Sequence, residues 1–516
     1  MAEEKRSFLD WLVFKGPAET AGELTTHLSE LDGRTLADKL RRLYAWILNN
    51  AVLTPAYDLA YGERGGEQLT FPNGDTLALP EGEAYSSYIL LPLLSLAARR
   101  KCLLVGGPGR GKTAIASLLA QAAGIEREAL RRAVQHGHPQ LTVTDLLGTP
   151  LPADLLRAEE LSQIKVAWRR WLELPVKIVD EYNRIPTKTQ SALLSLMAEG
   201  YAEQFGQVVE AGPSAWFLTA NDDAGGGTFA VIEALRDRID VTVRALTFNP
   251  WHLDRLLERL EKGRDPADAM PAEVRFQPAE LDQMEAEIRS MAVPRPVLRR
   301  IEFFLGALDF CQRASPLFEH KSKDALKLAG LRLGQVCNED CPLDKARHVC
   351  SQVETGVSVR TYLTTLAFAK AMAYFRGRPR VELEDVRQLA PFVLHEKLSP
   401  NRQSAYFSKG RERLLGDKAA WIRAMFDLAM DQYEALRPGD ASAVEPLLDE
   451  VAPGLTGLGR DEILRRLKTL TGVIRQYHRG GELSAPVYND LLMLKALALR
   501  YHAYLRWLAA GGKDGA

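Results

Sequence analysis

Gly106-Gly107-Pro108-Gly109-Arg110-Gly111-Lys112-Thr113 is the stretch that decides the fold of this 516-residue chain. It fits the pattern G-x-x-x-x-G-K-[ST] and follows the apolar run 103–105, which predicts a strand that leads into a phosphate-binding loop. Glycines permit a tight loop with inward N–H groups, and a helix that begins at Lys112 adds the positive end of its dipole. We expect nucleoside triphosphate to bind Gly106 through Ala114, with Lys112 at the β- and γ-phosphates and Thr113 at Mg²⁺.

Length and composition are those of a globular protein with several domains. Hydrophobic residues make up 46% of the chain, which is ample for several cores. Lys and Arg (66) nearly balance Asp and Glu (67), so overall charge gives no reason to expect nucleic acid as a partner. The N-terminus has no apolar leader, and the longest apolar stretch, 88–98, is too short to span a bilayer. We therefore expect a cytoplasmic protein without a membrane span.

The pattern of apolar residues divides the chain into four expected segments. Residues 1–84 form an accessory N-terminal module with a small hairpin at 69–79. In 85–248, short apolar strands at 103–105, 176–179 and 216–220 alternate with helices, which predicts an α/β domain with a mainly parallel sheet. Beyond this P-loop core, we expect an all-α lid with a cysteine-containing insertion (249–400) and a C-terminal helical domain (401–516).

Polar residues end two of the expected strands. The strand 176–179 ends in Asp180-Glu181, where Asp180 would support Mg²⁺ and Glu181 would polarise the attacking water. The strand 215–220 ends at Asn221, whose amide can donate to the γ-phosphate or to that water. Phosphoryl transfer needs mainly positioning and charge neutralisation, and these residues supply both.

A candidate arginine finger follows about one helix later. Arg238 lies between Asp237 and Asp240, and a guanidinium presented by a neighbouring subunit can neutralise charge on the transferred phosphoryl group. Such a residue is worth roughly 10³ to 10⁵ in rate. Arg236 is the alternative finger, and an ion pair of Arg238 with Asp237 or Asp240 is the structural alternative.

These residues together resemble the MoxR group of AAA+ ATPases. The resemblance is carried by three ordered stretches, which are 134–148, 180–194 (DEYNRIPTKTQSALL) and 234–238 (ALRDR). The family usually has an apolar residue at Tyr182, an aromatic residue at Ile239 and an uncharged residue at Lys177, so this chain looks like a divergent branch. The resemblance covers about residues 85–400.

The resemblance implies a homo-oligomeric, usually hexameric, ring. It implies two inserted elements, at about 141–164 and 200–212, which face the pore or a ring surface. Tyr201 and Phe205 would either grip a substrate there or pack the hairpin itself. It also implies that Arg360, in Gly356-Val357-Ser358-Val359-Arg360, contacts the γ-phosphate from the lid, and that Asn183-Arg184 couple the nucleotide to the neighbouring subunit.

The function that fits best is an ATP-hydrolysing remodelling or chaperone-type ATPase that acts on a partner protein. The resemblance implies a von Willebrand A-type partner. Two other classes stay open: a nucleic-acid motor, against which the balanced charge argues, and an ATP-gated scaffold with little turnover, against which Asp180 and Glu181 argue.

Three of the five cysteines lie close together in the expected lid. Cys337, Cys341, His348 and Cys350 have the residue types of a Cys₃His zinc site, and an iron–sulfur cluster is a further candidate. The spacing lacks the C-x₂-C doublet, and His348 and Cys350 are close in sequence for two ligands of one ion. The alternative is that these cysteines are reduced structural thiols.

Overall fold

The computed structural model describes residues 35–61, 68–74, 76–78, 83–160, 163–221, 229, 231–261, 266, 268–408, 410–436, 444–479 and 483–512. Residues 1–34, 62–67, 75 and 79–82 of the expected accessory module (1–84) therefore lie outside the described residues. The chain divides into two compact units. The first unit comprises Met1–Pro294 and Val359–Lys397, and the second comprises Arg295–Ser358 and Leu398–Ala516.

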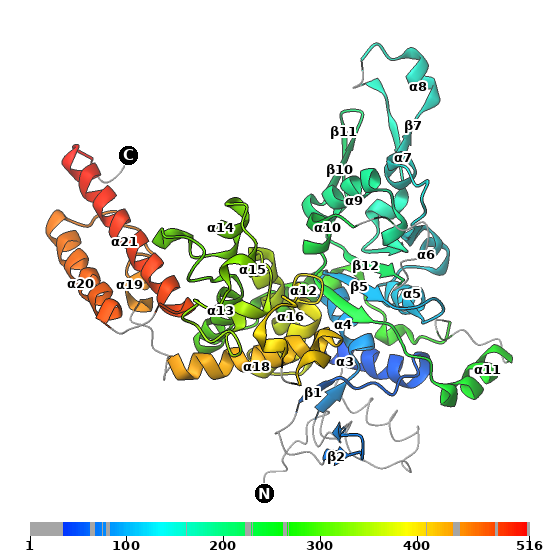
Figure 1. The fold of residues 1–516 in the computed structure, drawn as a ribbon. Helices are drawn as coiled ribbons and strands as arrows, with labels where there is room; N and C mark the ends of the chain where they lie inside the picture. Colours follow the sequence, from blue (N-terminus) through cyan, green and yellow to red (C-terminus); the bar gives the residue numbers. More distant parts are fainter. Residues whose placement is uncertain are drawn as a thin grey trace, which may run out of the picture. The chain divides into compact units, whose positions relative to one another are not determined.

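A five-stranded parallel sheet forms the centre of the first unit (Figure 1). Its order is β13-β5-β12-β9-β6. The strands are β5 (Lys101–Val105), β6 (Val134–His136), β9 (Val176–Asp180), β12 (Ala215–Ala220) and β13 (Val241–Arg244). The prediction of a mainly parallel sheet is confirmed, and β6 and β13 are additions that the sequence pattern did not predict.

Helices cover both faces of this sheet because each presents an apolar side to it. They are α4 (Ser87–Ala97), α5 (Lys112–Ala122), α6 (Arg127–Ala133), α9 (Thr187–Glu199) and α10 (Glu233–Asp237). Every residue of α4 is buried, since this almost wholly apolar helix packs against β5, β12 and β13. The longest apolar stretch of the chain is thus a core helix. Within the described residues, no helix is long and apolar enough to cross a membrane.

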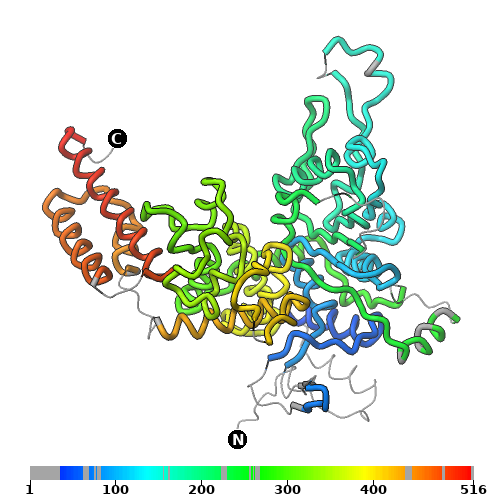
Figure 2. The backbone as a smooth tube through the Cα atoms, viewed as in Figure 1, coloured from blue at the N-terminus to red at the C-terminus, as the bar shows by residue number. Residues whose placement is uncertain are grey.

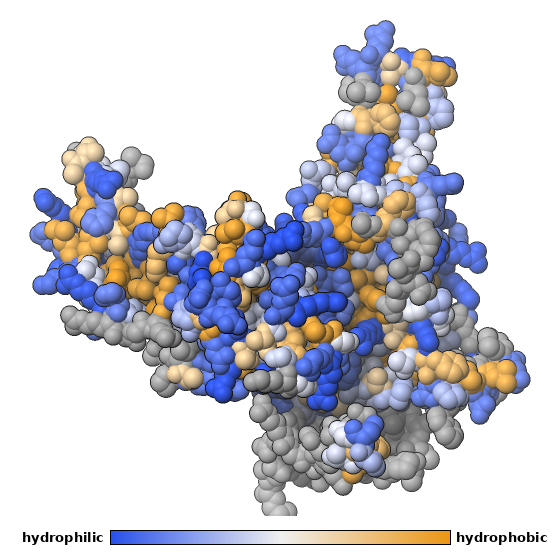
Figure 3. Space-filling model, viewed as in Figure 1, coloured by the Kyte–Doolittle hydropathy of each residue, from blue (hydrophilic) through white to orange (hydrophobic). Residues whose placement is uncertain are grey.

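Two antiparallel ribbons project from this core (Figures 1 and 2). One consists of β7 (Gly148–Pro150) and β8 (Val166–Trp168), with α7 (Val143–Leu147) before it and α8 (Pro152–Arg157) at its far end. The other consists of β10 (Tyr201–Gln204) and β11 (Gln207–Glu210). They occupy the two segments where the resemblance implied insertions. Apolar side chains are exposed on these ribbons (Figure 3), with Leu156 at 89% and Val208 at 58%.

The N-terminal part and several later helices belong to the same unit. They are α3 (Leu36–Trp46), the π-helix η1 (Ile47–Ala51), β1 (Leu59–Tyr61), β2 (Gln68–Thr70), β3 (Thr76–Ala78), β4 (Glu83–Tyr85), α11 (Leu253–Glu261), α12 (Pro278–Ser290), α16 (Val359–Phe375) and α17 (Leu383–Val393). The pairing of β2 with β3 confirms the predicted hairpin. Helix α16 packs against α3, α4, α12 and α17, so these helices share one core.

The second unit is mostly helical. Its helices are α13 (Arg295–Asp309), α14 (Lys323–Leu328), α15 (Leu333–Val336), α18 (Lys418–Leu436), α19 (Glu445–Asp449), α20 (Arg460–Arg479) and α21 (Ala485–Ala509). Helices α20 and α21 pack together over buried leucines and Tyr501, which confirms the predicted C-terminal helical region. Across both units, the described residues include the 3₁₀ turns η3 (Arg170–Glu173), η4 (Tyr182–Arg184), η5 (Pro250–His252), η6 (Ala272–Val274), η7 (Phe318–His320), η8 (Val349–Gln352), η9 (Ala405–Phe407) and η10 (Glu412–Leu415).

Candidate active site

The expected catalytic residues lie at the carboxyl ends of three neighbouring strands. Strand β5 leads into the loop 106–111, β9 ends at Asp180, and β12 stands between them and ends before Asn221. Because parallel strands present these ends at one edge, residues from distant parts of the sequence meet there. This edge is where open α/β sheets bind their ligands.

The loop has the backbone that its glycines allow. Gly111 precedes α5 with φ of 77°, in the left-handed region, and accepts a hydrogen bond from the Tyr88 hydroxyl (2.7 Å). A Cβ at Gly111 would lie 2.8 Å from the same hydroxyl oxygen. Both the conformation and the close approach therefore require glycine at this position.

Lys112 is drawn into the loop. Only 7% of its surface is exposed, and its Nζ donates to the carbonyls of Gly106 (2.5 Å) and Gly107 (2.7 Å) and to Asn221 Oδ1 (2.9 Å). The ammonium group thus stands between the loop and the end of β12. A triphosphate on the loop would meet this charge directly.

Asp180 is held by two threonine hydroxyls. Its Oδ1 accepts from Thr113 Oγ1 (2.8 Å) and from Thr219 Oγ1 (2.6 Å). Hard oxygen donors from the loop helix and from β9 therefore converge, which is the donor type that Mg²⁺ prefers. Thr113 and Asp180 fit the role of magnesium ligands on this ground.

Glu181 has a strained backbone and a fully engaged side chain. Its φ is 53°, an uncommon conformation for a residue other than glycine, and its N–H donates to Thr219 Oγ1 (2.9 Å). Its Oε1 accepts from Asn221 Nδ2 (2.8 Å), and its Oε2 lies 3.2 Å from Arg184 Nη1. Lys112, Asn221, Glu181 and Arg184 thus form one continuous polar chain.

Strand β6 brings a histidine to the same edge. His136 is the register partner of Asp180, and its Nδ1 lies 3.4 Å from Asp180 Oδ2. The following Gly137 donates its N–H to Asp180 O (2.7 Å), and a Cβ there would lie 2.3 Å from Glu181 O. Only glycine allows β6 to approach the backbone of Asp180 and Glu181 this closely.

A cavity of about 850 Å³ borders the phosphate loop. The loop backbone from Pro108 to Gly111 forms one wall. Apolar side chains form much of the rest, including Val52, Leu53, Ile115, Leu118, Leu130 and Phe248. The cavity has the size and lining of a site for the base and sugar of a nucleotide whose phosphates lie on the loop.

The two expected arginines stand apart from this network in the single chain. Arg360 Nη1 pairs with Asp237 Oδ2 at 3.0 Å. Arg238 ends α10, and its Nη1 donates to Ala234 O (3.1 Å) within the same helix. The roles of Arg360 at the γ-phosphate and of Arg238 as a finger remain predictions.

The expected zinc or iron–sulfur site is not present as predicted. Among the described residues, no group of three or more His, Cys, Asp or Glu is arranged to hold a metal ion. Cys311, rather than His348, lines one small cavity with Cys337, Cys341 and Cys350. Burial raises the pKa of Cys350 to about 12 and also raises the pKa values of Cys311 and Cys337. The reason is that the fold brings Cys311 to the cavity that Cys337 and Cys341 line, whereas His348 lines a different cavity, which it shares with Cys350.

Sequence reasoning did not identify Thr219 or His136. Thr219 lies inside an apolar strand, two residues before Asn221, so alternation along β12 places both on one side of the sheet. That spacing was a usable signal. His136 has no local signal, because its role depends on β6 being the neighbour of β9.

Comparisons with known proteins agree with this geometry. Residues 101–241 match the model of the ATPase family associated with various cellular activities (AAA), and residues 345–412 match the AAA lid domain. The uncharacterized protein YeaC of Bacillus subtilis (strain 168) is 26% identical over 312 residues, which cover 60% of this chain and 80% of YeaC. A crystal structure from Cytophaga hutchinsonii, provisionally described as an ATPase, is similar with a TM-score of 0.47 and 17% identity, over 77% of this chain and 98% of that one.

Proposed function

We propose that this chain is an AAA+ ATPase of the MoxR type, which binds ATP with Mg²⁺, hydrolyses it to ADP and phosphate in an oligomeric ring, and thereby remodels a partner protein; the matches to the AAA and AAA lid models support this. The observation that carries the proposal is the polar chain at the strand ends. It joins Lys112, Asn221 and Glu181 through contacts of 2.8–2.9 Å. Each of these groups has a separate task in phosphoryl transfer.

The residues would act in a definite order. Lys112 would exchange its contacts with the Gly106 and Gly107 carbonyls for phosphate oxygens, which also frees Asn221 Oδ1. Asn221 could then turn its amide from Glu181 toward the γ-phosphate. Glu181, released at Oε1, would orient water for in-line attack while Thr219 keeps its backbone in place. Mg²⁺ held by Thr113 and Asp180 would neutralise developing charge on the phosphoryl oxygens.

The ring and the partner are the further parts of the proposal. Arg238 lies at the end of α10 and has no role in the single-chain network described above, as expected of a residue that acts on a neighbour's nucleotide. A hexameric ring and a von Willebrand A-type partner follow from the resemblance. The exposed apolar residues of the two ribbons would supply contacts for a protein client.

Steady-state ATP hydrolysis by the full chain tests the catalytic part. Glu181→Gln should retain ATP binding and lose turnover by about 10² or more, since the water is no longer oriented. Glu199→Gln is the matched control, because Glu199 is an exposed glutamate at the end of α9. Turnover that is equal in the two variants would refute the proposal. Light scattering of Glu181→Gln with ATP tests the ring, and affinity capture on the same variant tests the partner class.

A further inference from the structure

The side chain of Gln207, on β11, forms hydrogen bonds between the two projecting ribbons. Its Nε2 donates to Ile164 O (2.7 Å), and its Oε1 accepts from Val166 N (3.3 Å). A primary amide that both donates to and accepts from one backbone imitates the pairing of an adjacent strand. The side chain therefore attaches the β10–β11 ribbon to the start of β8.

The base of the β10–β11 ribbon is attached to the catalytic strand β9 by Lys177. This lysine is fully buried, and its Nζ donates to Ala211 O (3.0 Å), directly after β11, and to Leu174 O (2.9 Å). An ammonium group buried in this way is stable only with such partners, and burial lowers its pKa to about 8. The contact therefore constrains where Ala211 can lie.

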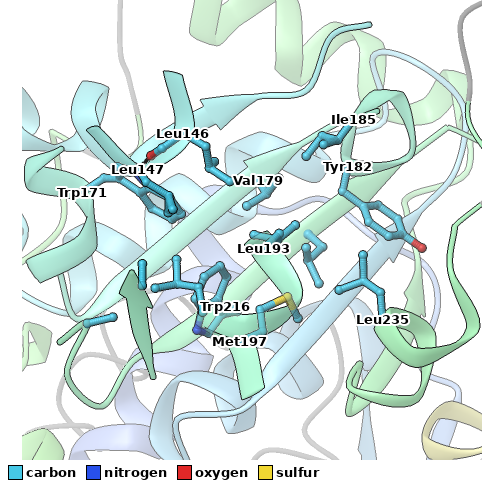
Figure 4. Close-up of a cluster of buried hydrophobic side chains, with 14 of the residues drawn as sticks. Leu146, Leu147, Trp171, Val179, Tyr182, Ile185, Leu193, Met197, Trp216 and Leu235 are labelled. Carbon is cyan, nitrogen blue, oxygen red and sulfur yellow. Dashed lines mark hydrogen bonds between the residues drawn. The ribbon is translucent and has the colours of Figure 1, made fainter. Parts of the chain in front are cut away.

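An aromatic pair extends the connection to the base of the other ribbon. Lys177 Nζ lies 5.7 Å from the centre of the Trp216 ring, and Trp216 meets Trp171 edge to face at 5.8 Å (Figure 4). Trp171 Nε1 donates to Leu146 O (2.7 Å), in α7 immediately before β7. All three side chains are buried, so the cluster has little freedom to rearrange.

Both strands that hold this cluster end in catalytic residues. Lys177 and Trp216 are register partners on β9 and β12. Lys177 precedes Asp180 by three residues, which is about 10 Å along a strand. β9 pairs with β12 over residues 176–179 and with β6 over residues 178–180, so we expect a displacement of its end to reach Lys177.

We propose that the β7–β8 and β10–β11 ribbons form a single arm, in which Gln207 is the clamp and Lys177 is the link to the catalytic strand. Both are positioning residues: their hydrogen bonds go to backbone groups of the ribbons and of Leu174, outside the polar chain at the strand ends, and they make the two ribbons respond together to the nucleotide state. This inference rests on the proposed function, because it requires a nucleotide that displaces the ends of β9 and β12. It explains why a divergent member of the family has a charged residue at position 177.

Hydrogen exchange of the full chain, with and without a non-hydrolysable ATP analogue and Mg²⁺, tests this inference. Binding is measured first, by titration with a fluorescent form of the analogue. In the wild type, exchange should change in both ribbons. In Gln207→Ala the change should persist in β10–β11 and become clearly smaller in β7–β8, where only the connection through Trp171 remains, whereas Glu203→Ala, an exposed residue of the same ribbon, should behave as the wild type.

Lys177→Met should bind the analogue and lose the response in both ribbons. Gln207 lies on a projecting ribbon, so we expect Gln207→Ala to fold. This variant therefore still decides the test if Lys177→Met does not fold. Absence of analogue binding to the wild type would overturn the proposed function as well as this inference. Binding with ribbon responses that are the same in Gln207→Ala and the wild type would overturn the single arm alone.

Discussion

Replacing Thr219 with valine tests the account of the catalytic acids most directly. The side chain is fully buried, and its hydroxyl donates to Asp180 Oδ1 (2.6 Å) and accepts from Glu181 N (2.9 Å). Valine has nearly the same shape, so packing on β12 should be preserved. The loss is one hydrogen bond to a charged group, worth about 1.5–3 kcal/mol, and the N–H of Glu181 is left without this acceptor.

The expected result is a fall in kcat with little change in nucleotide affinity. If about 2 kcal/mol of the lost interaction supports the transition state, kcat falls about 30-fold. The fall arises because Glu181, whose φ is 53°, loses the contact that holds its backbone. Steady-state hydrolysis gives kcat, and titration with a fluorescent ATP analogue gives the affinity.

Thr242→Val is the matched control, since Thr242 is a buried threonine of the edge strand β13 in the same sheet. A kcat for Thr219→Val within twofold of the control would refute the reasoning. A loss of nucleotide affinity equal to the loss of kcat would also refute it, because the hydroxyl would then act on the ground state.

Arg238→Ala should abolish the part of ATP turnover that rises with protein concentration, and nucleotide binding should stay intact. If the assembled variant turns over ATP as fast as the wild type, Arg238 is not the arginine finger. The pKa of Lys177 falls from 10.5 in the unfolded chain to about 8 in the folded chain. Between pH 8 and 10.5 the unfolded state therefore binds more protons than the native state, and the free energy of unfolding rises with pH. Lys177→Met should lack this gain, which amounts to about 3 kcal/mol, and denaturation followed by tryptophan fluorescence at pH 8 and 10.5 measures the difference. Because burial raises the pKa of Cys350 to about 12, its thiolate fraction at pH 8 is about 10⁴-fold below its thiol fraction. Iodoacetamide should therefore modify Cys350 far more slowly in the native than in the unfolded chain by peptide mass spectrometry, and equal rates would contradict its burial.

The P-loop core was predictable because its signals are local. The loop at 106–113 has a fixed spacing, and Asp180, Glu181 and Asn221 each directly follow a strand that is apolar enough to recognise. Strand β6 has only three residues, which is too short for an alternation of apolar and polar residues that would predict a strand. Strand β13 (VTVR) follows a charged segment and gave no clear signal either.

The relations between strands were not predictable, because they depend on the order of the sheet. His136 meets Asp180 only since β6 is the neighbour of β9, and Lys177 meets Ala211 only since the β10–β11 ribbon returns to the base of β9. The cysteine prediction failed for a related reason. Sequence proximity selected His348, whereas folding brings in Cys311 from 26 positions before Cys337.

The contact of Asn221 with Glu181 makes nucleotide entry an exchange rather than an addition. Asn221 is already satisfied by Lys112 on one side and Glu181 on the other, so a triphosphate gains only the difference between new and broken contacts. When the γ-phosphate leaves, these partners can close on each other again. If the proposed roles hold, the Asn221–Glu181 contact competes with the γ-phosphate for Asn221, and its return would favour the diphosphate state without any further residue.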